Sequence, residues 1–188
     1  MAQKDENLLA RIAKRISEPD PSREGSAGSI LTATAERYTD GPVEAGASLT
    51  AGFDPEAAAL FEAVVEAAYL VANADGVFDE TEQAAFHQVV HTACGDAIPE
   101  RQIAALLTDL AAQLEDDGID KRVKMVARTI TGPEQAREVL RVAAFIAFIS
   151  EGVSEVEREV MLKLAGRFGL GPEVIDEAVQ EVERALAG

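Results

Sequence analysis

Two short turns rich in acidic residues carry the clearest chemical signal in this 188-residue sequence. The first reads ADGVFDETE over residues 74–82, and the second reads SEGVSEVE over residues 150–157. In both turns an acid precedes glycine and valine, and a glutamate follows at the start of the next predicted helix. Glycine suits these positions because a helix commonly ends on a residue with positive φ. The second turn is one residue shorter, and the corresponding acids are Asp75 with Glu151 and Glu82 with Glu157.

The carboxylates of the two turns predict a site for a divalent cation. Two helices of like sequence are expected to pack as neighbours, which would bring the acids at their ends together. Like charges at short range repel each other unless they are solvated or bridged by a cation. Hard oxygen ligands favour Ca²⁺ or Mg²⁺ over zinc. The candidate ligands are Asp75, Asp79, Glu82, Glu151 and Glu157.

Helix capping is the alternative explanation for these acids. The spacings Asp79-x-x-Glu82 and Ser154-x-x-Glu157 are both typical of capping boxes. Acids in a first helical turn also suit the helix dipole. Capping does not account for Asp75 and Glu151, which are expected at the C-terminal ends of helices, where the dipole disfavours an anion.

Other kinds of site have less support in the sequence. His87, His91 and Cys94 lie at helical spacing, but Gln88 stands where the HExxH zinc motif has its catalytic glutamate. Exposed surface histidines are therefore the simpler interpretation. The sequence shows no supported nucleophilic triad and no phosphate-binding G-x-x-x-x-G-K loop. We expect a protein that is not an enzyme; an enzyme that uses the acidic cluster with Mg²⁺ is the least favoured alternative.

Apolar residues at helical spacing predict an all-α fold. The expected structure is a compact bundle of about seven helices, preceded by a flexible N-terminal tail, with the two acidic turns as parts of a two-fold helix–turn–helix repeat. No stretch alternates convincingly as a strand. The predicted helices span about 55–74, 80–93, 99–115, 120–130, 133–150, 155–168 and 172–186.

Residues 1–53 are predicted to form the flexible tail, and residues 54–188 the helical domain. Within the tail, residues 7–17 form a short amphipathic helix with basic flanks, followed by a linker rich in small residues. We expect this helix to dock into a groove on a protein partner. Docking onto the protein's own acidic body, weak contact with a membrane surface and an idle terminus are the alternatives. The apolar stripe of the helix comprises Leu8, Leu9, Ile12 and Ile16.

Charge and composition limit the classes of function. The formal net charge of −17 opposes binding to nucleic acid and suits cations or a basic partner. Cys94 is the single cysteine, which excludes an intrachain disulfide framework. The longest apolar run, residues 142–149, is far too short to cross a bilayer, and no secretory signal is evident, so we expect a cytoplasmic location. The predicted function is a binding or adaptor module with an acidic cation site; a purely structural protein-interaction domain is the alternative.

Residues 54–188 resemble the TerB-like family, the helical domain of tellurite-resistance and stress-response operons that also occurs at the N-terminus of a membrane-anchored DnaJ-type co-chaperone. The resemblance rests on A-x-A-D-G at residues 72–76, on the following Glu82, on EGVSEVE and on LAGRFGL at residues 164–170. It implies an all-α fold and an acidic metal site drawn from both repeats. Carried over by position, its ligands are Asp75, Glu82, Glu151 and Glu157, with Asp79 as a further candidate. The second turn departs from the pattern, because Glu151 replaces the usual aspartate and one residue is missing.

Overall fold

The computed structural model describes residues 2–19, 29–39, 54–95, 97–149 and 152–187. These residues contain nine α-helices and no strand, which confirms the all-α class; seven helices were expected in the bundle and one at residues 7–17 of the tail, so the count exceeds the prediction by one. The seven predicted helices are all present, within a few residues of the expected limits. They are α3 (Pro55–Ala72), α4 (Glu80–Cys94), α5 (Glu100–Asp117), α6 (Ile119–Thr129), α7 (Pro133–Ala147), α8 (Glu155–Arg167) and α9 (Glu173–Leu186). Helix α1 (Ala2–Ser17) contains the amphipathic helix predicted at residues 7–17, and α2 (Ile30–Thr39) was not predicted.

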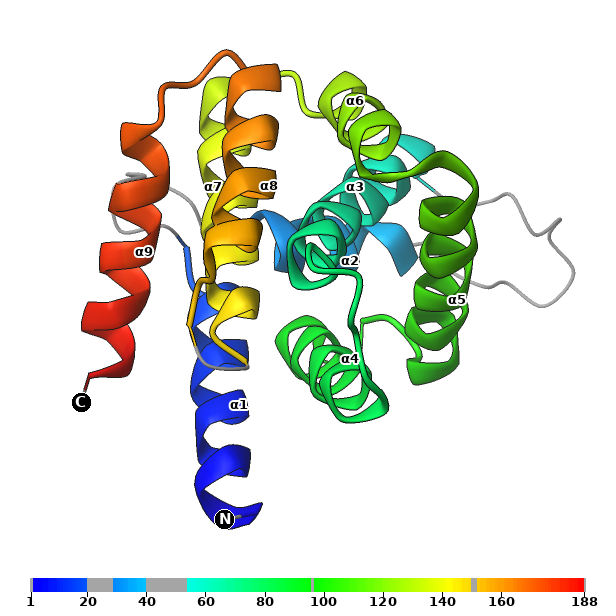
Figure 1. Cartoon of the computed structure of the whole chain (residues 1–188). Helices are drawn as coiled ribbons and strands as arrows, with labels where there is room; N and C mark the ends of the chain where they lie inside the picture. Colours follow the sequence, from blue (N-terminus) through cyan, green and yellow to red (C-terminus); the bar gives the residue numbers. More distant parts are fainter. Residues whose placement is uncertain (1, 20–28, 40–53, 96, 150–151, 188) are drawn as a thin grey trace, which may run out of the picture.

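Helices α3 and α7 form the centre of the molecule and pack against each other, with the other helices around them (Figure 1). Both are buried over most of their circumference, as their nearly continuous apolar sequences predict. Helix α3 begins at Pro55 after Asp54, whose carboxylate accepts hydrogen bonds from two backbone amides of the first turn. The two central helices end at the two acidic turns, so the core of the bundle determines where the turns lie.

A partly buried ion-pair network fixes α6 against α3. Arg122 of α6 contacts Glu66 of α3 at 2.5 Å and Asp117, at the end of α5, at 3.2 Å. Its side chain is 12% exposed, so the charge is compensated by two carboxylates rather than by water. The network places the short helix α6 beside α8, with which it also packs.

Residues 30–39 differ from the prediction of a flexible tail, because they form α2 and pack against α3. Ile30, Leu31 and Ala35 enter the core. The backbone amide of Ile30 donates a hydrogen bond to the buried carboxylate of Glu138 on α7. A carboxylate at a helix N-terminus satisfies a free amide and suits the dipole. Tertiary contacts therefore stabilise a helix whose own sequence signal is weak. The remaining tail residues 20–28 and 40–53 lie outside the described part of the chain.

Candidate functional site

The first acidic turn follows the C-terminal end of α3. Gly76 has φ of 76°, which confirms the positive φ expected for this glycine. The Asp75 carboxylate accepts a hydrogen bond from the backbone amide of Val77 at 2.8 Å. Asp75 therefore has a local role in the turn that the sequence reasoning did not anticipate, since an aspartate can bond to the backbone two residues on. This hydrogen bond involves Oδ1 of Asp75, so Oδ2 takes no part in it.

Both turns lead into a capping box, as their spacing predicted. At α4, Asp79 accepts hydrogen bonds from the amides of Thr81 (2.8 Å) and Glu82 (2.9 Å), and Glu82 Oε2 accepts one from the Asp79 amide. At α8, Glu157 Oε2 accepts hydrogen bonds from the amide (2.7 Å) and hydroxyl (2.8 Å) of Ser154. The capping explanation is thus correct for these residues, and it engages one carboxylate oxygen of each glutamate.

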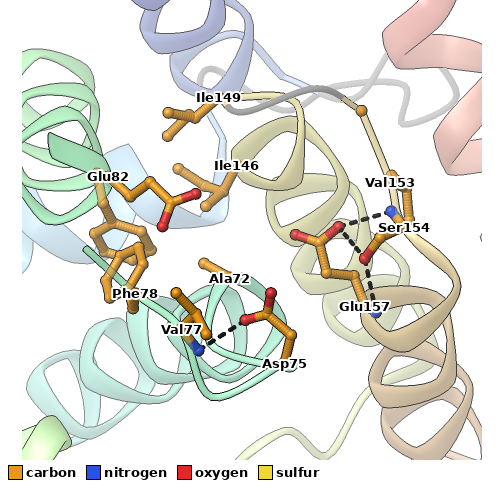
Figure 2. A pocket seen from close by; sticks show the side chains of 12 residues that line it. Ala72, Asp75, Val77, Phe78, Glu82, Ile146, Ile149, Val153, Ser154 and Glu157 are labelled. Atoms are coloured by element: carbon orange, nitrogen blue, oxygen red, sulfur yellow. Dashed lines mark hydrogen bonds between the residues drawn. The ribbon is translucent and has the colours of Figure 1, made fainter.

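The two turns also frame one pocket of about 470 Å³. Asp75, Glu82 and Glu157 line it, and Figure 2 shows their carboxylates facing the same space from the α3–α4 turn, from α4 and from α8. The repeat therefore brings together three of the five predicted ligands. Asp79 caps α4 and does not line the pocket. Glu151 lies outside the described residues.

The pocket has a negative potential with no cationic side chain among its described lining residues. Glu157 shows the effect most clearly, because its carboxylate is embedded in the protein and the residue is 8% exposed. Burial raises the pKa of Glu157, and the nearby charges of Asp75 and Glu82 raise it further, against the lowering effect of the Ser154 hydrogen bonds. The three carboxylates are therefore close enough to interact, and their mutual repulsion is uncompensated in the described structure.

The carboxylate oxygens of the pocket are suitable ligands for a hard divalent cation, but the side chains as placed do not form a complete coordination shell. Oδ2 of Asp75 and Oε1 of both Glu82 and Glu157 take no hydrogen bond within the described residues, so each carboxylate keeps one oxygen for another contact. No group of three acidic, histidine or cysteine side chains in the described ranges is close enough to hold an ion. Binding would need side-chain rotation, which is open to Asp75 because it is exposed.

The other half of the pocket is apolar and was not anticipated from the sequence. Phe78 and Phe86 pack edge to face with their ring centroids 5.9 Å apart, and Ile146 of α7 and Ile149, just beyond its end, also line the pocket. Val77, at the mouth, is 65% exposed. The available signal was Phe78, an aromatic residue within the first acidic turn. An apolar wall lowers the local dielectric, which strengthens any interaction with the carboxylates.

The histidines of α4 do not form a soft-metal site within the described residues. His87 and His91 stack with ring centroids 6.3 Å apart and are half-buried rather than fully exposed as predicted. Cys94 is buried, and burial raises the pKa of its thiol to about 12, so a reactive or metal-binding thiolate is strongly disfavoured.

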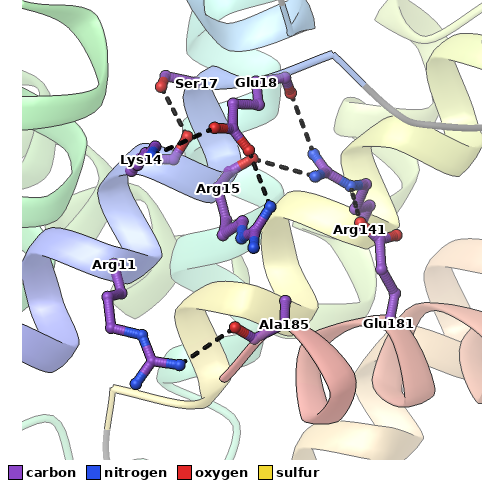
Figure 3. Close-up of polar contacts among 8 residues, drawn as sticks. All are labelled: Arg11, Lys14, Arg15, Ser17, Glu18, Arg141, Glu181 and Ala185. Carbon is purple, nitrogen blue, oxygen red and sulfur yellow. Dashed lines mark hydrogen bonds and ion pairs between the residues drawn. The ribbon is translucent and has the colours of Figure 1, made fainter. Parts of the chain in front are cut away.

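The predicted docking stripe lies against the protein's own body. Ile12 and Ile16 are fully buried, Leu8 and Leu9 are partly buried, and α1 packs on α4, α7 and α9. Arg141 of α7 donates hydrogen bonds to the backbone carbonyls of Arg15 (3.0 Å) and Glu18 (3.4 Å) and pairs with Glu181 at 2.7 Å (Figure 3). Docking onto the body was one of the alternatives, and the structure has this arrangement. Docking of α1 to a partner protein stays a prediction, and it would require α1 to dissociate from α4, α7 and α9.

The model of the family described as tellurite resistance protein TerB matches residues 61–180, more than half of the chain. The chain belongs to the TerB family. The TerB match includes both acidic turns and all residues described for the pocket, and it confirms the resemblance inferred from the turn motifs. Neither a search of curated proteins nor a search of solved structures found a match.

Proposed function

We propose that this TerB-family protein is a non-enzymatic cytoplasmic adaptor that binds a divalent cation, Ca²⁺ or Mg²⁺, in the pocket between its two acidic turns. The observation that supports the site is the convergence of Asp75, Glu82 and Glu157 on one pocket whose described lining includes no lysine, arginine or histidine. The family name suggests a role related to tellurite resistance. A role in stress responses follows only from the resemblance to domains of stress-response operons. Within the described residues, no helix is both long enough and apolar enough to cross a membrane.

The pocket residues have distinct roles in this proposal. Glu157 is the most buried of the three pocket carboxylates and is oriented by Ser154, so it would provide a preorganised oxygen. Asp75 is exposed and adjustable, and Glu82 is anchored by the capping box through one oxygen only. A bound dication would supply the positive charge that offsets repulsion among the three carboxylates. The protein's contribution is to hold these charges together in the folded state.

Isothermal titration calorimetry of the full chain with CaCl₂ and with MgCl₂ tests the proposal. Wild type should bind one of the ions, and Asp75→Asn should weaken that binding by at least about tenfold, because one charged oxygen ligand is lost. Asparagine keeps the acceptor for the Val77 amide, so the turn should persist. The matched control is Asp79→Asn, which removes an acid of the same turn that caps α4 outside the pocket. Asparagine is as good an N-cap as aspartate, so this variant should bind like wild type.

A purely structural interaction domain is the second candidate, and the two capping boxes support it because they give Asp79, Glu82 and Glu157 a role without any ion. It predicts no heat of binding for either ion. It also predicts equal thermal stability in EDTA and in excess cation. The first candidate predicts stabilisation by about 2.7 kcal/mol when the free ion is at 100 times its dissociation constant.

A further inference from the structure

The pocket between the two acidic turns is larger than a single metal ion requires. Its volume is about 470 Å³, and the carboxylates of Asp75, Glu82 and Glu157 face it from three different elements (Figure 2). No three acidic, histidine or cysteine side chains in the described part of the chain are close enough together to hold an ion. Cavities of about 300–1,000 Å³ commonly bind organic groups. With its side chains as placed, the pocket therefore has room for an organic cation that reaches several carboxylates at once.

Each of these carboxylates has one oxygen without a hydrogen-bond donor among the described residues. Glu157 shows this most clearly, because the residue is only 8% exposed. Its Oε2 accepts both hydrogen bonds from Ser154, and its Oε1 accepts none and faces the pocket (Figure 2). A buried charge without a partner costs free energy. A cationic ligand with several N–H donors would satisfy Oε1 of Glu157 together with the free oxygens of Asp75 and Glu82.

Apolar side chains line much of the rest of the pocket, and an ion makes no use of them. They include Val77, Phe78, Phe86, Ile146 and Ile149. Val77 is 65% exposed, the largest exposed fraction among the large hydrophobic residues of the described chain. Long basic side chains bury an apolar stem and keep a charged head beside polar groups. Such a side chain contacts both halves of the pocket, whereas a divalent cation contacts only the carboxylates.

Arginine fits this combination better than lysine. A guanidinium is planar and has five N–H donors, so it can contact carboxylates on different sides, and it stacks on aromatic rings. The ammonium group of lysine is a compact charge that holds its water more strongly. The net charge of −17 attracts a basic segment from a distance. No lysine, arginine or histidine of the described pocket lining competes for the carboxylates.

We propose that this pocket binds the side chain of an arginine from a partner protein, in a segment where the residues next to the arginine are apolar. The guanidinium lies among the three pocket carboxylates, and the stem and the neighbouring apolar residues lie against Val77, Phe78 and Ile146. The inference rests on the adaptor function proposed above and names the chemistry of the partner. The divalent cation and the guanidinium use the same oxygens, so each should weaken the binding of the other.

An NMR titration of the ¹⁵N-labelled full chain in EDTA tests the proposal with three blocked tripeptides. N-acetylated, C-amidated Leu-Arg-Leu, Leu-Gln-Leu and Gly-Arg-Gly are each added to about 10 mM at about 0.15 M salt. Leu-Arg-Leu should shift the amide signals of Val77, Gly152 and Ser154 in a saturable way. Leu-Gln-Leu should bind at least about tenfold more weakly, because it brings no cation to the carboxylates. Gly-Arg-Gly should bind about threefold more weakly, because it leaves the apolar wall uncovered.

Glu157→Gln shows whether the pocket or the overall negative charge holds the peptide. Glutamine keeps the capping box, and the affinity for Leu-Arg-Leu should fall about tenfold because a buried charge is lost. Glu155→Gln is the matched control, since it removes an exposed acid of the same helical turn that does not line the pocket, and it should bind like wild type. Equal loss of affinity in both variants would overturn the proposal. So would an absence of pocket shifts, or an affinity for Leu-Gln-Leu or Gly-Arg-Gly equal to that for Leu-Arg-Leu.

Ion competition separates this inference from the proposed cation site. The ion that binds in calorimetry should reverse the shifts of the peptide-bound protein, and an ion that binds without reversing them would overturn the shared pocket. Val77→Ala should weaken Leu-Arg-Leu binding about threefold and leave the ion affinity unchanged, because it removes an apolar contact and no oxygen. Peptide binding in EDTA with no heat of ion binding would reject the cation site and support the arginine site. Ion binding with no peptide shifts would support the cation site and overturn the arginine site.

Discussion

The Glu157 carboxylate has surroundings that act on its pKa in opposite directions. Hydrogen bonds from Ser154 favour the charged form, whereas burial and the charges of Asp75 and Glu82 favour the protonated form and prevail. The folded-state pKa is therefore above the usual value of 4.5, and the folded chain binds more protons than the unfolded chain over that interval. Stability from this group is fully present below pH 4.5 and is lost as the pH rises through the folded-state pKa.

The prediction is that Glu157→Gln flattens the pH dependence of stability in the ion-free protein. Glutamine still forms a capping box, so the α8 terminus should persist. Urea unfolding in EDTA between about pH 5 and about pH 8 should show wild type losing stability relative to the variant as the pH rises. Glu62 also has a raised pKa, but it is present in both proteins and cancels in the difference. Parallel curves for the two proteins would show that Glu157 ionises normally.

Gly76 is the second residue whose substitution has a defined expectation. A Cβ at this position would meet nothing within 4 Å, so the cost of a larger residue is in the backbone alone. Gly76→Val should lower the free energy of unfolding by about 1–3 kcal/mol, because β-branched residues rarely adopt φ near 76°. Gly76→Asn should cost less, since asparagine visits the left-handed region more readily. Thermal melts of both variants check this; equal loss in both would point to a cause other than φ.

At the scale of elements, the helices with a continuous apolar face were predictable, and those that depend on remote partners were not. Helices α3 to α9 have periodic apolar residues, caps at Asp54, Asp79 and Ser154, and breaks at glycine or proline. In α2 the sequence ILTATAERYT has small and polar residues on most sides. The position of α2 depends on a hydrogen bond from the Ile30 amide to Glu138, more than 100 positions later in the chain. Local sequence patterns do not reveal such a contact.

Glu138 should therefore determine whether α2 stays folded onto α3. Glu138→Ala removes the acceptor of the Ile30 amide and should lower stability by about 1–3 kcal/mol. Glu138→Gln keeps an acceptor oxygen and is the matched control, with a smaller loss expected. Hydrogen exchange followed by NMR should show faster exchange of the α2 amides in the alanine variant than in the glutamine variant. Unchanged protection of α2 in Glu138→Ala would contradict this role.

Helix α1 shows why an amphipathic stripe alone does not identify its partner. The stripe with Ile12 and Ile16 was predicted to dock on a partner protein, and in the structure it packs against the chain itself, because the same pattern fits either kind of groove. The groove between α4, α7 and α9 and the contacts of Arg141 with the end of α1 arise from the tertiary structure. A sequence pattern predicts that one face of a helix will be buried. The long-range contacts of the fold determine which surface that face packs against.

At the scale of the whole molecule, the duplicated turn was sufficient to predict all three acids of the described pocket. The repeat indicated that Asp75, Glu82 and Glu157 belong together, because each lies at the end or start of a helix adjoining the core. The apolar half with Phe78 and Ile146 was not predictable, because core residues and pocket residues have the same composition. The local bonds of Asp75 and Glu82 likewise depend on geometry that spacing alone does not determine.

Anomalous diffraction from crystals equilibrated with MnCl₂ would show whether the pocket between the two acidic turns binds a divalent cation. Mn²⁺ shares the preference of Mg²⁺ for carboxylate oxygens and has an anomalous signal that locates it. We expect an anomalous peak in the pocket, about 2.0–2.6 Å from oxygens of Asp75, Glu82 and Glu157, and its loss in crystals of Asp75→Asn. A pocket without such a peak, in crystals where the three carboxylates remain as close as in the present structure, would contradict the proposed cation site.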